Sequence, residues 1–140
     1  MIFPDARPAE AAQGDLPLYQ DWAVDFATGR LKTRGGRQYL VSGKEALAVW
    51  IWKALRTSRY RYPAYGPSYG QEFSRLRGWT DFAAIQGELK RLITEALLVS
   101  PYLLSVGDWA FQRQEDRVRA RFRVATVYGD LEAETEAALS

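Results

Sequence analysis

The stretch "RVRARFRVATVYGDLEAETEA", residues 117–137, decides the fold of this 140-residue chain. Apolar and charged residues alternate through it with a period of two, which is typical of β-strands that bury one face. The charged residues are arginines in the first half and glutamates in the second half, namely Arg117, Arg119, Arg121 and Arg123, then Glu132, Glu134 and Glu136. Four like charges along one strand repel one another unless anions or free solvent lie beside them.

The acidic half of the stretch supplies such anions in one of two ways. A two-residue turn at Gly129-Asp130 would fold it back in cis, so that Arg123 faces Glu136 and both charged faces lie on one side. The same strand can instead be donated to a neighbouring subunit by β-augmentation. The sequence leaves these arrangements open, beside the simpler interpretation of a solvated strand face.

Helices are predicted upstream of these strands. Residues 42–45 have the pattern of a capping box and start a helix that runs to about Arg56. A weaker box at residues 68–71 opens a short helix, which Gly78 stops. The apolar residues of the first helix recur at helical spacing, namely Leu47, Trp50, Ile51, Ala54 and Leu55, and they predict one buried stripe.

A third helix begins near Thr80, which can cap it, and ends at Pro101. Its apolar stripe consists of Phe82, Ile85, Leu89, Leu92, Ile93, Ala96 and Leu97. Gly87 lies inside this helix, where glycine costs ~1 kcal/mol relative to alanine. Close packing at that position is therefore the expected reason for the glycine.

Short strands complete the chain. Residues 21–26 alternate, with Trp22, Val24 and Phe26 on one face. Gly35-Gly36 and residues 114–116 are predicted hairpin turns. We therefore expect a single α+β domain in which two longer helices and one short helix pack on antiparallel hairpins. The expected divisions are a flexible arm (1–15), the α+β domain (16–128) and an acidic strand or tail (129–140).

The composition excludes most site chemistries. The chain contains neither cysteine nor histidine, which excludes Cys-His and Ser-His-Asp catalysis and zinc sites built on those residues. A glycosidase needs two acids ~5 to ~9.5 Å apart, and its candidates, Glu72 and Asp81, are explained more simply as helix-surface acids. No apolar run approaches the ~18 residues of a membrane span. We predict no catalytic, cofactor-binding or metal-binding residue and no membrane contact.

The loop "RTSRYRYPAYGPSYG", residues 56–70, interleaves arginine with tyrosine. This pattern suits a platform for single-stranded nucleic acid. It also suits tyrosines that pack over a helix with their hydroxyls at the surface, or a protein-binding hot spot stiffened by prolines. The net charge of only +2 places nucleic acid behind the other two. The interface candidates in this loop are Arg59, Tyr60, Arg61, Tyr62 and Tyr65.

The order of motifs from residue 41 to residue 79 is similar to the contractile-tail baseplate wedge family, often labelled "tail lysozyme-like". It looks closest to the short branch in PBSX-like defective prophages. The positions that carry the pattern are Gly43, Glu45, Ala46, Leu47, Trp50, Ile51, Leu55, Thr57, Arg59, Pro63, Tyr65, Tyr69, Gly70 and Gly78. The later "EALLVSPYLLSV" and "VATVYGD" extend the resemblance over residues 16–130. Ser100-Pro101-Tyr102 stands where the wider family has Glu-Pro-Arg, so the roles of that acid and arginine do not transfer.

The resemblance implies a structural, non-enzymatic protein of the tail baseplate, with a fold like the conserved sheath domain, whose neighbours exchange strands. It implies that the protein initiates sheath assembly and contacts wedge subunits, the tail sheath protein, and tube or hub proteins in a six-fold assembly. The implied location is the virion tail, built in the host cytoplasm. The arginine and glutamate stripes and the tyrosine loop are then its interfaces. The alternatives are a nucleic-acid-binding module using the loop and the arginine stripe, and a muralytic lysozyme-like enzyme.

Overall fold

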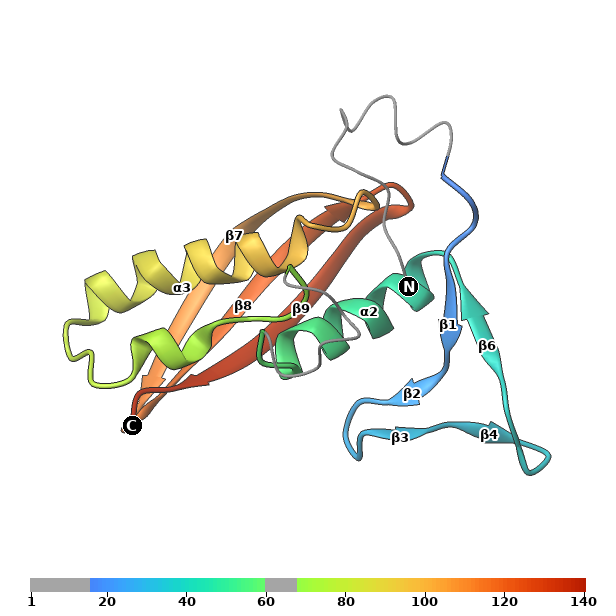
Figure 1. Ribbon diagram of the computed structural model, residues 1–140, viewed down its shortest axis with the longest axis horizontal. Helices are drawn as coiled ribbons and strands as arrows, with labels where there is room; N and C mark the ends of the chain where they lie inside the picture. The colour runs from blue at the N-terminus through green and yellow to red at the C-terminus, as the bar shows by residue number, and fades with distance from the viewer. Residues whose placement is uncertain (1–15, 60–67) are drawn as a thin grey trace.

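The computed structural model describes residues 16–59 and 68–140. Two helices lie over one face of a three-stranded antiparallel sheet of order β7-β8-β9 (Figure 1). A 3₁₀-helix, η2, precedes the second of them along the chain. The bounds are α2 Lys44–Arg56, η2 Phe73–Leu76, α3 Phe82–Leu97, β7 Leu103–Gln114, β8 Arg117–Thr126 and β9 Gly129–Ala138. The predicted α+β class with two longer helices and one short one is confirmed. The arm predicted at residues 1–15 lies outside the described residues.

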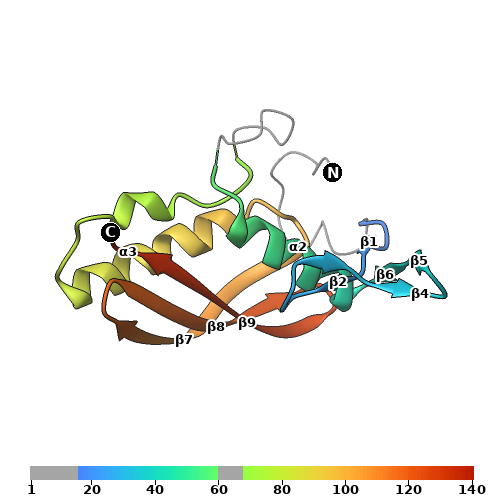
Figure 2. The ribbon, with the colours of Figure 1, turned by 90° about the horizontal axis from the view of Figure 1, so that it is seen from below.

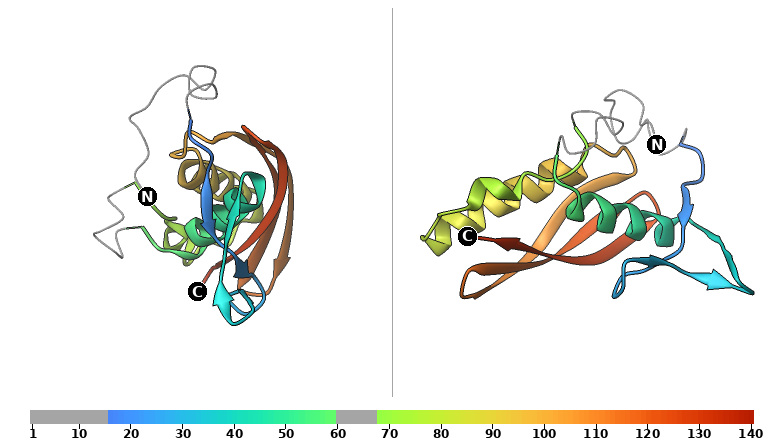
Figure 3. Two further views of the ribbon diagram at one scale, coloured as in Figure 1. Left: turned by 90° about the vertical axis from the view of Figure 1, so that its right-hand side faces the viewer. Right: turned by 60° about the horizontal axis from the view of Figure 1, so that its bottom comes forward.

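Six short strands form an N-terminal lobe that projects beyond the start of α2 (Figures 2 and 3). They pair as three antiparallel ribbons, β1 Gln20–Trp22 with β6 Leu40–Ser42, β2 Val24–Asp25 with β3 Arg30–Leu31, and β4 Thr33–Arg34 with β5 Arg37–Gln38. The predicted turn at Gly35-Gly36 joins β4 to β5.

The expectation that Trp22, Val24 and Phe26 share one face along residues 21–26 is wrong. Val24 is buried, but Trp22 is 44% exposed and Phe26 is 46% exposed. The alternation breaks at Ala23, whose amide donates to the carbonyl of Tyr39 while its carbonyl accepts from the amide of Lys32. These bonds turn the chain so that β1 and β2 pair with different strands.

The core lies between the helices and the sheet. Every second residue of β8, from Val118 to Val124, is buried, as the alternation predicts. The predicted stripes of both helices face these side chains; every member is buried except Phe82, which is only partly covered. Packing both helices on one face leaves the arginines of β8 on the other face, which we call the outer face.

The register of the second hairpin differs from the prediction. The turn is formed by residues 127–128 rather than by Gly129-Asp130, so Arg123 opposes Glu132 instead of Glu136. The shift along the partner strand is four residues, an even number. Because side chains alternate with a period of two, the arginines and glutamates still lie on the same face, as predicted.

Side-chain bonds at the turn explain the shift. The hydroxyl of Thr126 donates to the carbonyl of Gly129 over 2.6 Å and accepts from the amide of Tyr128 over 3.0 Å. The Tyr128 hydroxyl accepts from the amide of Tyr19 over 3.0 Å, which fixes the turn against the start of the described chain. Gly129 begins β9 with a φ of +112°, a conformation in which glycine avoids the steric cost of a side chain.

The start of α2 also differs from the capping-box prediction. Gly43 is the N-cap residue, with a φ of +66° and no side-chain cap. Ser42 lies in β6 opposite Gln20. The amide of Gly43 donates to the carbonyl of Tyr19. The pairing of β1 with β6 therefore extends to the start of the helix, and the predicted reciprocal cap between Ser42 and Glu45 does not form.

The caps of the other helices were placed slightly wrong. Asp81 caps α3, its carboxylate accepting from the amide of Ala84 over 3.1 Å, in place of Thr80. The weaker box at residues 68–71 does not form, because its glutamine instead accepts from the amide of Phe73 within η2. In both cases a helix forms where it was predicted. Only the residue that accepts hydrogen bonds from its first amides differs.

Gly87 is exposed on α3, and a Cβ added there would meet no atom within 4 Å, so the expected close packing is absent. We predict that Gly87→Ala stabilises the fold by ~0.5–1 kcal/mol, because alanine loses less backbone entropy in a helix. The measurement is urea unfolding followed by circular dichroism.

Gly70→Ala is the matched control. Gly70 has a φ of +98°, and its Cβ would lie 2.6 Å from the carbonyl oxygen of Thr57. This variant should lose ~1–3 kcal/mol. A destabilised Gly87→Ala variant would contradict the open helix surface.

Candidate functional site

The outer face of the sheet carries a ladder of ion pairs between β8 and β9. Each arginine of β8 has a carboxylate within 4 Å. The distances are 3.3 Å for Arg117–Glu136, 3.1 Å for Arg119–Glu136, 3.9 Å for Arg121–Glu134, 3.4 Å for Arg123–Glu132 and 3.6 Å for Arg123–Asp108. Residues 129–138 thus pair in cis, one of the two arrangements that the sequence left open, and their acids balance the repulsion among the arginines.

Glu136 is the most strongly bound acid of this ladder. Hydrogen bonds from Arg119 and then Arg117 hold the pKa of its carboxyl below the usual value of 4.5. Both partners are exposed, so each pair contributes at most ~1 kcal/mol of stability. The ladder therefore orients β9 and sets the surface charge pattern more than it stabilises the fold.

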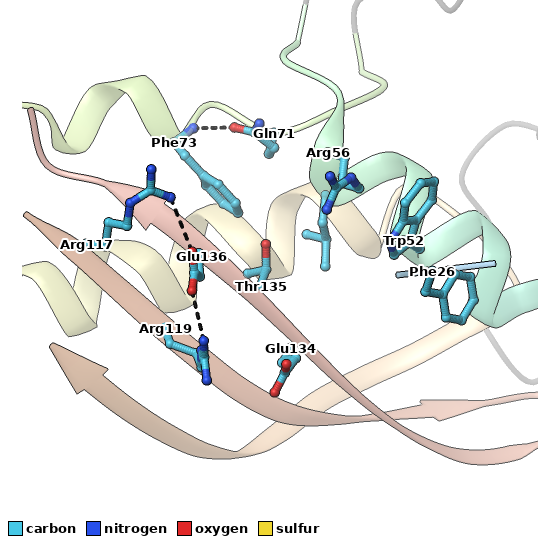
Figure 4. A pocket seen from close by; sticks show the side chains of 11 residues that line it. Phe26, Trp52, Arg56, Gln71, Phe73, Arg117, Arg119, Glu134, Thr135 and Glu136 are labelled. Carbon is cyan, nitrogen blue, oxygen red and sulfur yellow. Dashed lines mark hydrogen bonds and ion pairs between the residues drawn. The ribbon is translucent and has the colours of Figure 1, made fainter. Parts of the chain in front are cut away.

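A groove runs between α2 and β9, and its lining includes residues from both faces of that strand. Two adjoining hollows of about 610 Å³ and 410 Å³ share Phe26, Trp52, Leu55 and Glu134. Figure 4 shows the larger hollow, with Phe26 and Trp52 on one side and Glu134, Thr135 and Glu136 on the other. The remaining residues that line the two hollows are Ala48, Ile51, Arg56, Gln71, Phe73, Arg117, Arg119, Arg121, Leu131, Glu132, Ala133, Thr135 and Glu136.

Stacked side chains build the α2 wall of the groove. The rings of Phe26 and Trp52 stack with centroids 5.6 Å apart and 22° between their planes. The guanidinium of Arg56 lies 4.8 Å from the Trp52 ring centroid. The sequence pattern did not predict this wall, although Trp52 lies next to two residues of the apolar stripe of α2. Its position outside the five-residue stripe was the available signal.

The two outer strands of the sheet have different edges. β9 pairs with β8 through ten consecutive positions without a shift, and no strand among residues 16–59 and 68–140 pairs with its other edge. β7 contains two register shifts, and Asp108 in the second has a φ of +55°. Bulges twist an edge and interrupt its row of hydrogen-bonding groups. Of the two edges, that of β9 is therefore the regular one.

Arg59 is the described member of the candidates in the loop; Tyr60, Arg61, Tyr62 and Tyr65 lie outside the described residues. Its guanidinium pairs with Glu72 over 3.1 Å. Its amide donates to the carbonyl of Gln71, whose amide donates to the carbonyl of Thr57. Arg59 thus closes the base of the loop.

The acids considered for catalysis have structural partners. Glu72 pairs with Arg59, and Asp81 caps α3. On α3, Arg91 binds both Glu88 and Glu95, at the i+3 and i+4 spacings that bring side chains together on a helix. Within the described ranges no three acidic, histidine or cysteine side chains gather to hold a metal ion. No helix there is long and apolar enough to cross a membrane.

Comparison with known proteins relates this chain to contractile injection systems. A model of the contractile injection system sheath initiator family matches residues 20–129. The chain is also 32% identical over 119 residues to the phage-like element PBSX protein XkdS of Bacillus subtilis (strain 168), covering 82% of this chain and 79% of that protein. The family match runs from β1 to the first residue of β9, so it includes both helices and the two strands before β9.

The low pKa of Glu136 predicts acid sensitivity. A carboxyl whose pKa is lowered by folding contributes stability above its unfolded value, and loses it as the pH falls through the folded value. Glu136→Gln should therefore lower the free energy of unfolding at pH 7 by at most ~1 kcal/mol. The difference from the parent should vanish below the folded pKa.

Urea unfolding between pH 2 and pH 7 measures this difference. About 1 M salt should shrink it at pH 7, because screening weakens exposed pairs. Equal stabilities of the two proteins at pH 7 in low salt would mean that the pairs of Glu136 contribute nothing.

Proposed function

The chain belongs to the family of contractile injection system sheath initiators, and we propose that its three-stranded sheet is the platform on which the first sheath subunits assemble. The family makes it a structural protein of phage-tail type. The finer proposal is that a neighbouring subunit adds a strand to the free edge of β9. The unbroken register of β9 is the observation that carries it.

Strand addition suits this edge for a physical reason. An edge strand presents unpaired backbone amides and carbonyls, and an extended segment of another chain can satisfy them. The regular ten-residue register of β9 offers such a row of groups, whereas the bulges of β7, at its shifts against β8, twist that strand. The main chain would supply the affinity of this contact, and the side chains its specificity.

The surroundings of β9 define the incoming strand. Its side chains alternate between two faces. On the inner face they would meet Trp52, Leu55 and Ala133 of the smaller hollow, which favour apolar groups. On the outer face they would meet Glu132 and Glu134, which are 76% and 60% exposed at the side chain although each already has one arginine partner. Basic residues at alternate positions of the incoming strand would extend the ladder by one row.

The wider setting follows from the same proposal. The protein would sit in the tail baseplate of the virion, near the tube, after assembly in the host cytoplasm. Its neighbours would be other wedge subunits, the sheath protein and tube or hub proteins, in six-fold symmetry. The loop closed by Arg59 would provide a second contact through Tyr60, Arg61, Tyr62 and Tyr65.

Filling the groove tests strand addition. Ala133→Trp places a large side chain in the groove from β9, and Ala48→Trp does so from α2. Both should reduce the fraction of particles with assembled sheath, counted by electron microscopy, by at least ~10-fold, because a strand contact worth ~1.4 kcal/mol or more is lost. Urea unfolding checks that each variant folds.

Ala83→Trp is the matched control, because Ala83 is exposed on α3 and away from the groove. It should leave sheath assembly unchanged. Normal sheaths on a folded Ala133→Trp or Ala48→Trp protein would exclude the groove as the site of strand addition.

A charge swap tests recognition of the outer face. Single reversal of Arg121 would put two carboxylates together at the position of Glu134 and disturb the hairpin. The double variant Arg121→Glu/Glu134→Arg keeps the pair and reverses its orientation, so its stability should stay within ~0.5 kcal/mol of the parent. Sheath assembly should fall if a neighbouring subunit recognises the order of charges on the outer face.

The measurement combines urea unfolding with the same count of sheathed particles. An Arg121→Lys/Glu134→Asp variant keeps the charge pattern and should assemble normally. Normal sheath assembly by the Arg121→Glu/Glu134→Arg variant would mean that no neighbour recognises the order of charges at this pair.

A further inference from the structure

The distal part of the N-terminal lobe concentrates positive charge. Residues 26–40 contain four basic residues and no acid, out of 19 basic and 17 acidic residues in the chain. The rest of the chain is left with 15 basic and 17 acidic residues. The four cations are Arg30, Lys32, Arg34 and Arg37. The net positive charge of the protein therefore arises in one projecting lobe.

These cations differ from the arginines of β8. Each β8 arginine has a carboxylate partner, whereas none of the four lobe cations forms an ion pair within the described part of the chain. Arg34 only lies over the ring of Tyr39, 4.1 Å from its centroid. Residues 26–38 are all exposed. The positive charge of the lobe is thus available to a partner.

The same lobe exposes apolar side chains. Among the described residues seven large hydrophobic side chains are exposed, and five of them belong to residues 18–40, namely Leu18, Trp22, Phe26, Leu31 and Leu40. Trp22 and Leu40 oppose each other across β1 and β6. The other face of this ribbon carries Asp21, which binds Lys53 of α2 over 3.0 Å. The apolar pair therefore points away from the helix.

The lobe is held in a defined shape despite its short strands. Ala23 and Val24 are buried, and both backbone groups of Ala23 are bonded, to Tyr39 and to Lys32. The ion pair of Asp21 with Lys53 joins the ribbon to α2. A preorganised surface loses little entropy on binding, so the lobe would bind a partner at a low entropic cost.

We propose that the N-terminal lobe, residues 18–42, docks on an acidic surface of another protein, with Trp22 and Leu40 as its apolar contacts and the exposed cations of residues 30–37 as its charged ones. Apolar centres with tryptophan and arginine are typical of protein interfaces. A nucleic acid would use the cations through its phosphates but would give the exposed aliphatic side chains nothing to bury against. Trp22, Leu40 and the four cations lie outside the lining of the groove beside β9, so this contact does not depend on strand addition there.

A photo-cross-linking amino acid at Leu31, placed in the full chain in cells that make the particle, tests the proposal. The expected product joins residue 31 to an acidic peptide of a different protein, identified by mass spectrometry. Arg34→Glu/Arg37→Glu should reduce the yield by about 10-fold or more, because reversed charges at an interface rim oppose association. Arg77→Glu/Lys90→Glu is the matched double reversal outside the lobe and should keep the yield.

Several results would overturn the proposal. They are an adduct with DNA or RNA, an adduct with a second copy of this chain, no adduct at all, or a yield that the lobe reversal leaves unchanged. Circular dichroism of each purified variant confirms the fold. Loss of sheath assembly through the groove variants would leave this result unaffected, so the two proposals fail separately.

Discussion

Strand β8 is paired on both edges and buried on one face, and the rest of the structure depends on that position. Its apolar side chains hold both helices, while its arginines must face away from them. Four cations at alternate positions would repel one another without the acids of β9. The hairpin that brings β9 alongside is therefore both a part of the sheet and the source of its counter-charges. The same hairpin leaves the outer edge of β9 as the open side of the sheet.

Sequence periodicity predicted most of this frame. The period of two in residues 117–137 and the apolar stripes of both helices depend on burial alone, and burial decides which face of an element turns inward. The side of the sheet on which Glu134 lies was predictable for the same reason. A wrong turn position left that side unchanged, because the register moved by an even number of residues.

Hydrogen bonds between residues far apart in the sequence were not predictable. The Tyr128 hydroxyl accepts from the amide of Tyr19, a contact between residues 109 positions apart that holds the turn in place. Gly43 replaced Ser42 at the start of α2 because β6 was already paired with β1. The groove was missed for a related reason. Its wall needs Phe26 stacked on Trp52, and periodicity within one element says nothing about partners from another.

The bulges of β7 give the sheet a direction. A sheet with two regular edges can be extended from either side, and its growth then has no defined order. With one edge bulged and the other regular, a strand added as proposed would pair with the edge of β9. In this respect the sheet resembles a primer, which has one end that can be extended and one that cannot. In the proposed strand addition this asymmetry would give growth one direction, and it arises from the two register shifts in β7, with Asp108 in the second.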